Sequence, residues 1–240
     1  MNISEDKTVA QIVTENIKAS HVFKKHNIDF CCGGNIALKN VCEEKGIDFE
    51  TLAEELHHFD TVLENSYDYD NWPLDVLMDH ITSVHHQYVE ENIPLLIQYA
   101  ARVAEVHGSQ YPEVITINEL FREVARELVI HMKKEELILF PYIQQLVKAK
   151  RKNTTPSRPH FENISSPIHM MEEEHEQAGD VFKMINSLST NYTPPKGACN
   201  TFKALYDKLG EFEEDLHKHI HLENNILHPK ALVLEKELIA

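Results

Sequence analysis

The chain has 240 residues, 42% of them hydrophobic, and a formal net charge of −16 from 23 Lys and Arg against 39 Asp and Glu. This charge argues against nucleic acid and anionic membranes as partners, because both attract clustered positive charge. Four cysteines cannot make a disulfide scaffold, the N-terminus lacks a signal-peptide pattern, and no apolar run approaches the length of a membrane span, so a cytoplasmic protein is expected. Only 7 glycines and 10 prolines favour an all-α fold.

The N-terminal residues 1–59 are predicted to form a small helical domain, followed by a polar linker at residues 60–71. Apolar residues at helical spacing run from Val9 to Phe23, which predicts a first helix. Two shorter helices are expected over residues 35–44 and 49–59.

A Cys-Cys-Gly-Gly turn separates the first of these helices from the second. The two glycines permit a tight turn, and a thiolate at the start of the next helix would be stabilised by the helix dipole. One interpretation is therefore that Cys31 and Cys32 are redox or iron-handling thiols. The alternative is a small buried turn, since cysteine is frequently buried without a chemical role. Cys42 and Cys199 are expected to be small core residues.

Four longer helices follow and predict an antiparallel four-helix bundle over residues 72–240. Pro94 lies inside the first of them and predicts a kink. A polar loop at residues 151–166 separates the second helix from the third. The four helices are expected over residues 72–107, 112–150, 166–190 and 194–228.

One motif occurs twice in the bundle. Residues 131–141 read HMKKEELILFP and residues 219–229 read HIHLENNILHP, so both fit H-x-x-x-E-x-x-I-L-x-P. A histidine and a glutamate four residues apart share one helix face. His86 precedes the first motif at nearly the distance at which His175 precedes the second. The repeat therefore offers paired imidazoles and carboxylates, which suit two transition-metal ions.

The apolar seam of each helix indicates which of the 16 histidines point into the bundle. In the fourth helix, His219 and Glu223 occupy seam positions, whereas His217 and His221 do not. The second helix repeats this arrangement, and its seam runs through Ile117, Phe121, Val124, Leu128, His131, Glu135 and Ile138.

The seams of the first and third helices differ in how clearly they select an inward histidine. The third selects His175 over His169. In the first, the seam fades upstream of His86, so His80 and His85 remain competitors. Inward glutamates favour a metal site over isolated core histidines, because a buried carboxylate is costly unless it is paired or bound to metal.

The donor types and their order narrow the class of metal site. Imidazoles and carboxylates suit iron or manganese, with zinc as an alternative. Ferritin-like di-iron bundles place Glu before His at i, i+3, whereas here the histidine comes first and the spacing is i, i+4. The chain also lacks the H-E-x-x-H motif of zinc proteases.

The His-rich bundle resembles the hemerythrin-like di-iron domain, and the segment ASHVFKKHNIDFCCGG is similar to the N-terminal domain of the repair-of-iron-centres family (the ScdA/YtfE type). Further matching segments are DNWPLDVLMDHI, HMKKEELILFP, EEEHEQAG, NYTPPKGAC and HIHLENNILHPKA. The resemblance implies a hemerythrin-like bundle with two non-haem iron ions in an oxo- and carboxylate-bridged centre. Carried over by position, which favours His86 over its competitors, the implied ligands are His86, His131, Glu135, His175, His219 and Glu223.

This family is associated with repair of iron–sulfur clusters damaged by oxidative or nitrosative stress. The resemblance therefore implies damaged iron–sulfur proteins as partners, nitric oxide or oxygen as small ligands, and a homodimer. Iron supply and nitric oxide reduction at the di-iron centre both fit it, and whether the protein is an enzyme stays open. The alternatives are a hemerythrin-like carrier or sensor of oxygen or nitric oxide, and a metal-free structural bundle.

Two details accompany the implied ligand set. After the last ligand the family usually reads LFPRA, whereas residues 227–231 read LHPKA, so His228 replaces an apolar ring and is expected to alter packing or access. Glu174 belongs to an acidic run that is otherwise expected to be solvated. It is a candidate proton carrier at the entrance of the site.

Overall fold

The computed structural model describes residues 3–62, 68–157, 159, 161 and 163–239. Within these residues the regular secondary structure is helical, apart from an isolated bridge between Thr8 and Ala37. The all-α prediction is therefore confirmed. No helix in this part of the chain combines the length and the hydrophobicity that crossing a bilayer requires.

Contacts divide the chain into two compact units. The first comprises residues 1–78, 146–156 and 217–240, and the second comprises residues 79–145 and 157–216. Both boundaries near residues 146 and 217 fall inside continuous helical segments.

The N-terminal part of the first unit contains four helices around an apolar core. Thr8 and Gln11 form a capping box that starts the first helix. The apolar stripe predicted to form one helix is broken at Asn16, whose side chain accepts a hydrogen bond from the backbone N–H of Lys18 at 3.1 Å. The helices are α1 (Val9–Glu15), α2 (Ala19–Lys25), α3 (Leu38–Lys45) and α4 (Phe49–Val62).

The predicted linker at residues 60–71 is partly helical. Helix α4 runs to Val62, and a short 3-10 helix, η1, covers Tyr69–Asn71. Residues 63–67 of the linker lie outside the described part of the chain. The proposed domain boundaries at residues 59 and 72 stay a prediction.

The rest of the first unit is built from α5 and from the ends of the long helical segments. Helix α5 (Leu74–His80) carries Asp75, which pairs with Arg151 of α8 (Phe140–Lys152) at 2.9 Å. Lys150 of α8 pairs with Glu237 of α11 (His228–Ile239) at 2.8 Å. Helix α1 packs against η4 (Glu223–Leu227), the segment that precedes α11.

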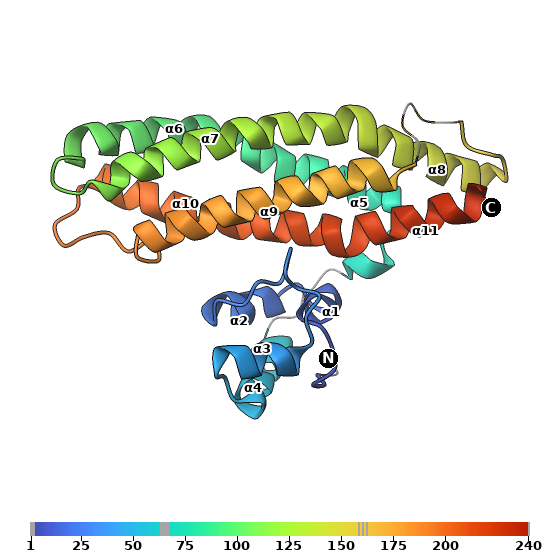
Figure 1. Cartoon of the computed structure of the whole chain (residues 1–240), viewed down its shortest axis with the longest axis horizontal. Coiled ribbons are helices and arrows are strands. Elements are labelled where there is room, and N and C mark those ends of the chain that lie inside the picture. Colours follow the sequence, from blue (N-terminus) through green and yellow to red (C-terminus); the bar gives the residue numbers. More distant parts are fainter. Residues whose placement is uncertain (1–2, 63–67, 158, 160, 162, 240) are drawn as a thin grey trace. The chain divides into compact units, whose positions relative to one another are not determined.

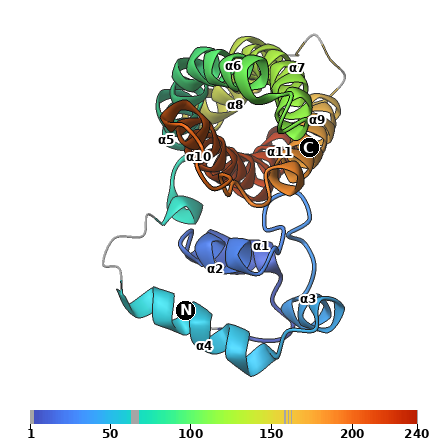
Figure 2. The same ribbon diagram turned by 90° about the vertical axis from the view of Figure 1, so that its left-hand side faces the viewer.

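The second unit is an antiparallel four-helix bundle, as predicted. Successive long helices run in opposite directions (Figure 1), and seen end-on they surround a common core (Figure 2). The rings of Phe121, Phe182 and Phe212 fill that core, with centroid distances of 5.6 to 6.4 Å. The helices are α6 (Gln87–His107), α7 (Glu113–Lys134), α9 (Ser165–Leu188) and α10 (Asn200–Leu222), of which residues 200–216 belong to this unit.

The fourth helical segment differs at both ends from its prediction. It begins at Asn200 rather than Pro194, because residues 190–192 and Gly197 have positive φ values that interrupt a helix. It continues through Ile239 rather than stopping near His228. No glycine or proline lies between residues 230 and 239, so nothing in that stretch breaks the helix.

Three π-helical segments interrupt the long helices, and the sequence analysis did not anticipate them. They are η2 (Ile81–His86), η3 (Glu135–Leu139) and η4 (Glu223–Leu227). In η3 and η4 the N–H of residue 140 or 228 donates to the carbonyl of Glu135 or Glu223, five residues back. A proline follows each of these two segments, and a wide turn relieves the clash that its ring makes in a regular helix.

The wide turn corrects one predicted core position. Ile138 was expected to continue the inward seam after Glu135, but its side chain is 51% exposed, whereas Leu139 is 1% exposed. A π turn holds more residues than an α turn, so the inward position moves one residue further along the chain. The seam prediction at Ile138 is therefore wrong.

Candidate metal centre

Four of the predicted ligands meet in the interior of the second unit. His86 ends η2, His131 lies in α7, Glu135 begins η3 and His175 lies in α9. Each of these side chains is at most 2% exposed. Glu135 Oε2 lies 3.3 Å from His86 Nε2 and 3.4 Å from His131 Nε2, and the Nε2 atoms of His131 and His175 are 2.9 Å apart.

This arrangement has the composition of a cation site. One ligand atom each of His131, Glu135 and His175 lies within 4.8 Å of the others. Imidazole nitrogens and carboxylate oxygens are the donors that iron, manganese and zinc accept. Burial would make a lone carboxylate costly, and a cation among these atoms would offset that cost. The residues present therefore fit a metal ion.

A glutamate supports each of two histidines from outside this cluster. His86 Nδ1 lies 2.9 Å from Glu136 Oε1, and His131 Nδ1 lies 2.9 Å from Glu174 Oε2. Lys133 donates to Glu136 at 2.8 Å, and Lys134 donates to Glu174. A carboxylate on Nδ1 fixes the tautomer in which the Nε2 lone pair points into the interior.

The two outer glutamates have lowered pKa values. The hydrogen bond from His131, joined by one from Lys134, outweighs partial burial and lowers the pKa of Glu174 to about 2. Partial burial also opposes ionisation of Glu136, but hydrogen bonds from Lys133 and His86 lower its pKa. Both groups are therefore carboxylates at neutral pH.

Of these two outer residues, Glu174 was predicted from the sequence and Glu136 was not. Glu174 was expected near the site entrance, and it lines a cavity of about 300 Å³ together with His131, Lys134 and Arg126. Glu136 was not singled out. Its signals were its place directly after Glu135 and its i, i+3 spacing from Lys133.

The histidines that competed with His86 or His175 make other contacts. His85 is buried, but its Nδ1 lies 2.9 Å from Asp215 Oδ1. His80 is half-buried with its ring edge-on to His85, and desolvation lowers its pKa. His169 is exposed and pairs with Glu173 at 3.2 Å.

The second copy of the motif lies in the first unit. His219 of α10 and Glu223, which begins η4, are 1% and 0% exposed. The Nε2 atom of His219 lies 3.2 Å from Glu223 Oε1. This pair repeats the relation of His131 to Glu135, including the π turn that starts at the glutamate.

His221 differs from its prediction. It was expected to lie off the inward seam, yet it is 0% exposed, because residues of the N-terminal segment cover that side of α10. Its Nδ1 lies 3.4 Å from the carbonyl oxygen of Phe30, and its Nε2 lies 3.4 Å from Thr14 Oγ1. Desolvation lowers the pKa of His221 to about 4, so the ring is neutral.

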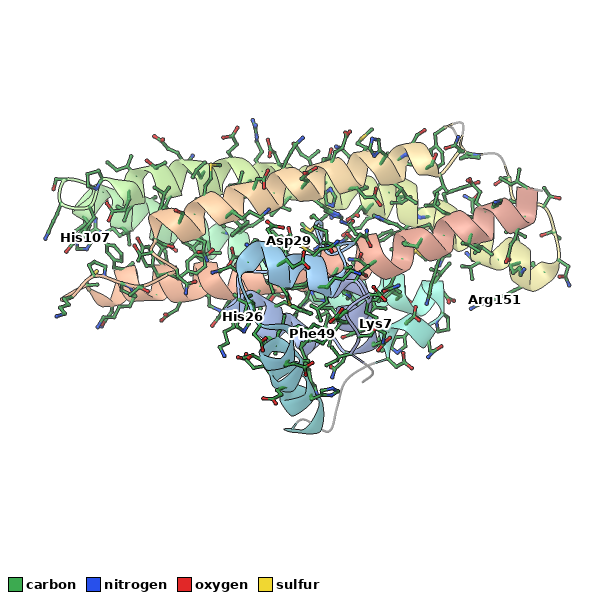
Figure 3. All side chains as sticks on the ribbon, turned by 60° about the horizontal axis from the view of Figure 1, so that its bottom comes forward. Lys7, His26, Asp29, Phe49, His107 and Arg151 are labelled. Carbon is green, nitrogen blue, oxygen red and sulfur yellow. The ribbon has the colours of Figure 1, made fainter. Side chains whose placement is uncertain are left out.

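Cys31 and Cys32 lie in the loop between α2 and α3, in which Figure 3 labels Asp29. Cys31 is 4% exposed and its Sγ lies 3.3 Å from Asp29 Oδ1, whereas Cys32 is partly exposed. Hydrogen bonding with Cys32, burial and the negative charge of Asp29 raise the pKa of Cys31. Helix α3 begins only at Leu38, so the predicted stabilisation of a thiolate by that helix is wrong.

The remaining cysteines divide between core and surface. Cys42 is buried, as predicted, whereas Cys199 is exposed, with its Sγ 3.3 Å from His107 Nε2. His228, the residue that departs from the family pattern, is 0% exposed. It therefore occupies an interior position, as the apolar ring of the family pattern would.

Fold and donor set together define a hemerythrin-type helical bundle with a buried cation site, and sequence comparisons agree. Residues 77–231 match the hemerythrin HHE cation binding domain, and residues 5–60 match ScdA_N, a domain of unknown function (DUF542). The iron-sulfur cluster repair protein YtfE of Yersinia pseudotuberculosis (strain PB1/+) is 37% identical over 215 residues, which are 90% of this chain and 91% of the relative. YtfE of Yersinia pestis (strain Pestoides F) matches to the same extent. The chain belongs to this YtfE family, which confirms the resemblance seen in the sequence.

Proposed function

We propose that this protein repairs iron–sulfur clusters damaged by oxidative or nitrosative stress in the cytoplasm. The observation that carries the proposal is the buried histidine and glutamate cluster, found in a chain that matches iron-sulfur cluster repair proteins along 90% of its length. Damaged iron–sulfur proteins are the proposed partners.

The proposed cofactor is a pair of non-haem iron ions held by His86, His131, Glu135, His175, His219 and Glu223. Two histidines for each ion, together with the two carboxylates, would suit a pair of iron ions. The support is the burial of all six side chains, the repeated motif, and the single cation-binding domain matched by residues 77–231. When bound, the iron pair supplies iron for cluster repair and coordination positions for nitric oxide or oxygen.

The protein's own residues account for retention and release of iron. Glu136 and Glu174 orient His86 and His131 through their Nδ1 atoms, so the Nε2 donors are in place before metal arrives. Protonation or displacement of a shared carboxylate removes negative charge from the site and loosens it. Iron in this protein is therefore proposed as a cargo as well as a cofactor.

Nitric oxide reduction is the finer part of the same proposal. The cavity of about 300 Å³ that His131, Lys134 and Glu174 line gives a small ligand room beside one histidine of the cluster. Consumption of nitric oxide with formation of nitrous oxide would assign this chemistry. Reversible oxygen binding without either product would favour a carrier or sensor.

The test starts with the full chain purified anaerobically and loaded with Fe²⁺. We expect about two iron ions per chain, as the donor set of two histidines for each ion and two shared carboxylates implies. The loaded protein should restore activity to an enzyme whose iron–sulfur cluster nitric oxide has damaged. His175→Gln should lower the iron content and the repair, whereas His169→Gln, on the same helix but exposed, should change neither.

The opposite results identify the alternatives. A chain that folds normally but retains less than about one iron ion after loading would be a structural bundle. A loaded protein that neither restores a damaged cluster nor consumes nitric oxide would overturn the repair proposal while leaving the metal site intact.

A further inference from the structure

The two copies of the motif differ at six positions, three of which lie close to the glutamate and change the contacts of the chain there. The first copy has a lysine, a glutamate and a leucine there, and the leucine is 73% exposed. The second copy has a histidine and two asparagines, and the histidine is fully buried. The substituted pairs are Lys133 and His221, Glu136 and Asn224, and Leu137 and Asn225.

All three residues of the second copy contact the segment that carries the two thiols. Asn225 Nδ2 donates to the backbone carbonyl of Cys31 at 3.1 Å, and Asn224 Nδ2 lies 4.0 Å from Cys32 Sγ. His221 Nδ1 lies 3.4 Å from the carbonyl oxygen of Phe30, one residue before Cys31, and 3.2 Å from Asn225 Nδ2. This Nδ1 atom donates to the carbonyl when protonated and accepts from the amide in the other tautomer. Three of the six departures from the first copy are thus residues that contact this loop.

The same helical turn carries a proposed metal ligand. Glu223 begins η4, and Asn224 and Asn225 follow it directly. The carbonyl of Glu223 accepts the hydrogen bond from His228 that closes the π turn. A change in the position of Glu223 therefore reaches Asn225 through two peptide units and the turn they share.

We propose that His221, Asn224 and Asn225 are positioning residues that couple the metal site to the Cys31–Cys32 loop through η4. This inference rests on the proposed function, because it needs metal at His219 and Glu223. Metal bound there fixes η4 and keeps the loop seated, so the thiols react slowly. Loss of metal frees η4, and the loop opens and exposes the thiols. Linkage requires the converse: unseating the loop weakens metal binding.

The test measures alkylation of Cys31 and Cys32 by iodoacetamide in the full chain, metal-free and loaded with Fe²⁺ under anaerobic conditions. Mass spectrometry gives the rate for each thiol and the metal content is measured in the same sample. Alkylation of the loaded protein should be slower by at least about fivefold, which is the lower end of typical couplings between two sites. Its loop, residues 28–37, should also exchange amide hydrogens more slowly.

Two variants separate seating of the loop from local charge. Asn225→Asp removes the donor to Cys31 and adds a negative charge, and it should abolish the difference between metal-free and loaded rates while weakening Fe²⁺ retention against a chelator. Leu137→Asp adds the same charge at the equivalent position of the first copy, where the side chain is exposed. It should leave the alkylation rates as they are in the wild type. Asn225→Gln keeps an amide donor, so Fe²⁺ should still slow the alkylation of the thiols in this variant, unlike in Asn225→Asp.

Each outcome decides something. Equal alkylation rates in a protein that holds both metal ions overturn this inference and leave the proposed function standing. Protection by Fe²⁺ that survives in His219→Gln/Glu223→Gln would show that the thiols bind the metal themselves, which also overturns it. A wild-type chain that takes up no metal overturns the proposed function and this inference together.

Discussion

The first copy of the His-x-x-x-Glu motif, in α7 and η3, and the second, in α10 and η4, share their sequence frame and their π turn but not their surroundings. In the first copy the position after the glutamate is Glu136, which supports His86, and Leu137 beyond it is exposed. In the second copy the same positions are Asn224 and Asn225, which face the thiol loop. The duplicated motif thus makes two different sets of contacts: one copy supports His86 and the other contacts the thiol loop.

The two copies also differ in the ring that they place directly before the proline of the motif. Phe140 of the first copy stacks on the ring of His86, with centroids 5.8 Å apart. His228 of the second copy is equally interior, at 0% exposed, but brings two ring nitrogens in place of a hydrocarbon edge. The frame constrains size and burial at this position and leaves its polarity open.

The largest expected effect comes from the residues that the two copies have in common. Glu135→Gln and Glu223→Gln each remove one of the two carboxylates proposed to bind metal, so metal content should fall from about two ions per chain to about one or fewer. Anaerobic reconstitution followed by elemental analysis measures this. Glu176→Gln, an exposed change beside His175, serves as the control. Full metal content in one variant alone would show that the two copies are not equally required for metal binding, and full content in both would show that neither glutamate is required.

The isoleucines three residues after each glutamate give the next effect. Ile226 is 1% exposed, so Ile226→Ala should destabilise the chain by about 2–5 kcal/mol through lost contacts and a cavity. Ile138 is 51% exposed, so Ile138→Ala should change stability by about 0.5 kcal/mol or less. Denaturant unfolding of the two metal-free variants measures the difference. Equal losses would mean that the same surroundings cover both copies.

This pair of isoleucines also shows which features of the fold helical periodicity does not predict. The helical periodicity predicted the bundle and the inward faces of the second, third and fourth helices, because those follow from a 3.6-residue repeat, whereas the first helix left His80 and His85 as competitors of His86. Ile138 was misplaced because a π turn shifts that repeat by one residue. The prolines at 141 and 229 were the available signal, since each removes a backbone donor just where the turn widens.

The N-terminal segment accounts for a further difference from the prediction. His221 was assigned to an outer face because only the seam that faces the bundle was considered. Its burial depends on Phe30 and Thr14, which are 191 and 207 residues away in sequence. Periodicity within one helix carries no information about a distant segment that covers its far side, so this contact could not be predicted from the sequence.

The outer glutamates test whether the first copy's extra support matters. Glu136→Gln and Glu174→Gln keep the size of the side chain but replace a carboxylate on the Nδ1 of His86 or His131 with a neutral amide. Loss of such a partner typically costs about 10–100-fold in metal affinity. Competition with a chelator measures it, with Glu173→Gln, on an exposed pair, as the control. Unchanged metal affinity in both variants would show that the outer carboxylates do not contribute to metal binding.

The smallest expected effect concerns the N-terminal helices, whose segment contacts His221 of the second copy. Glu55 of α4 accepts hydrogen bonds from Lys25 at 2.9 Å and His26 at 3.1 Å, and these bonds lower its pKa. A carboxylate with a lowered folded-state pKa adds stability above its unfolded-state pKa, about 4.3. That stability disappears as the pH falls through the folded-state value.

Glu55→Gln should therefore be slightly less stable than the wild type at pH 7, by less than about 1 kcal/mol because the pair is partly exposed. The gap should close as the pH drops below about 4. Thermal unfolding across this range measures it, and a gap that widened on acidification would contradict the assignment of the lowered pKa to this pair.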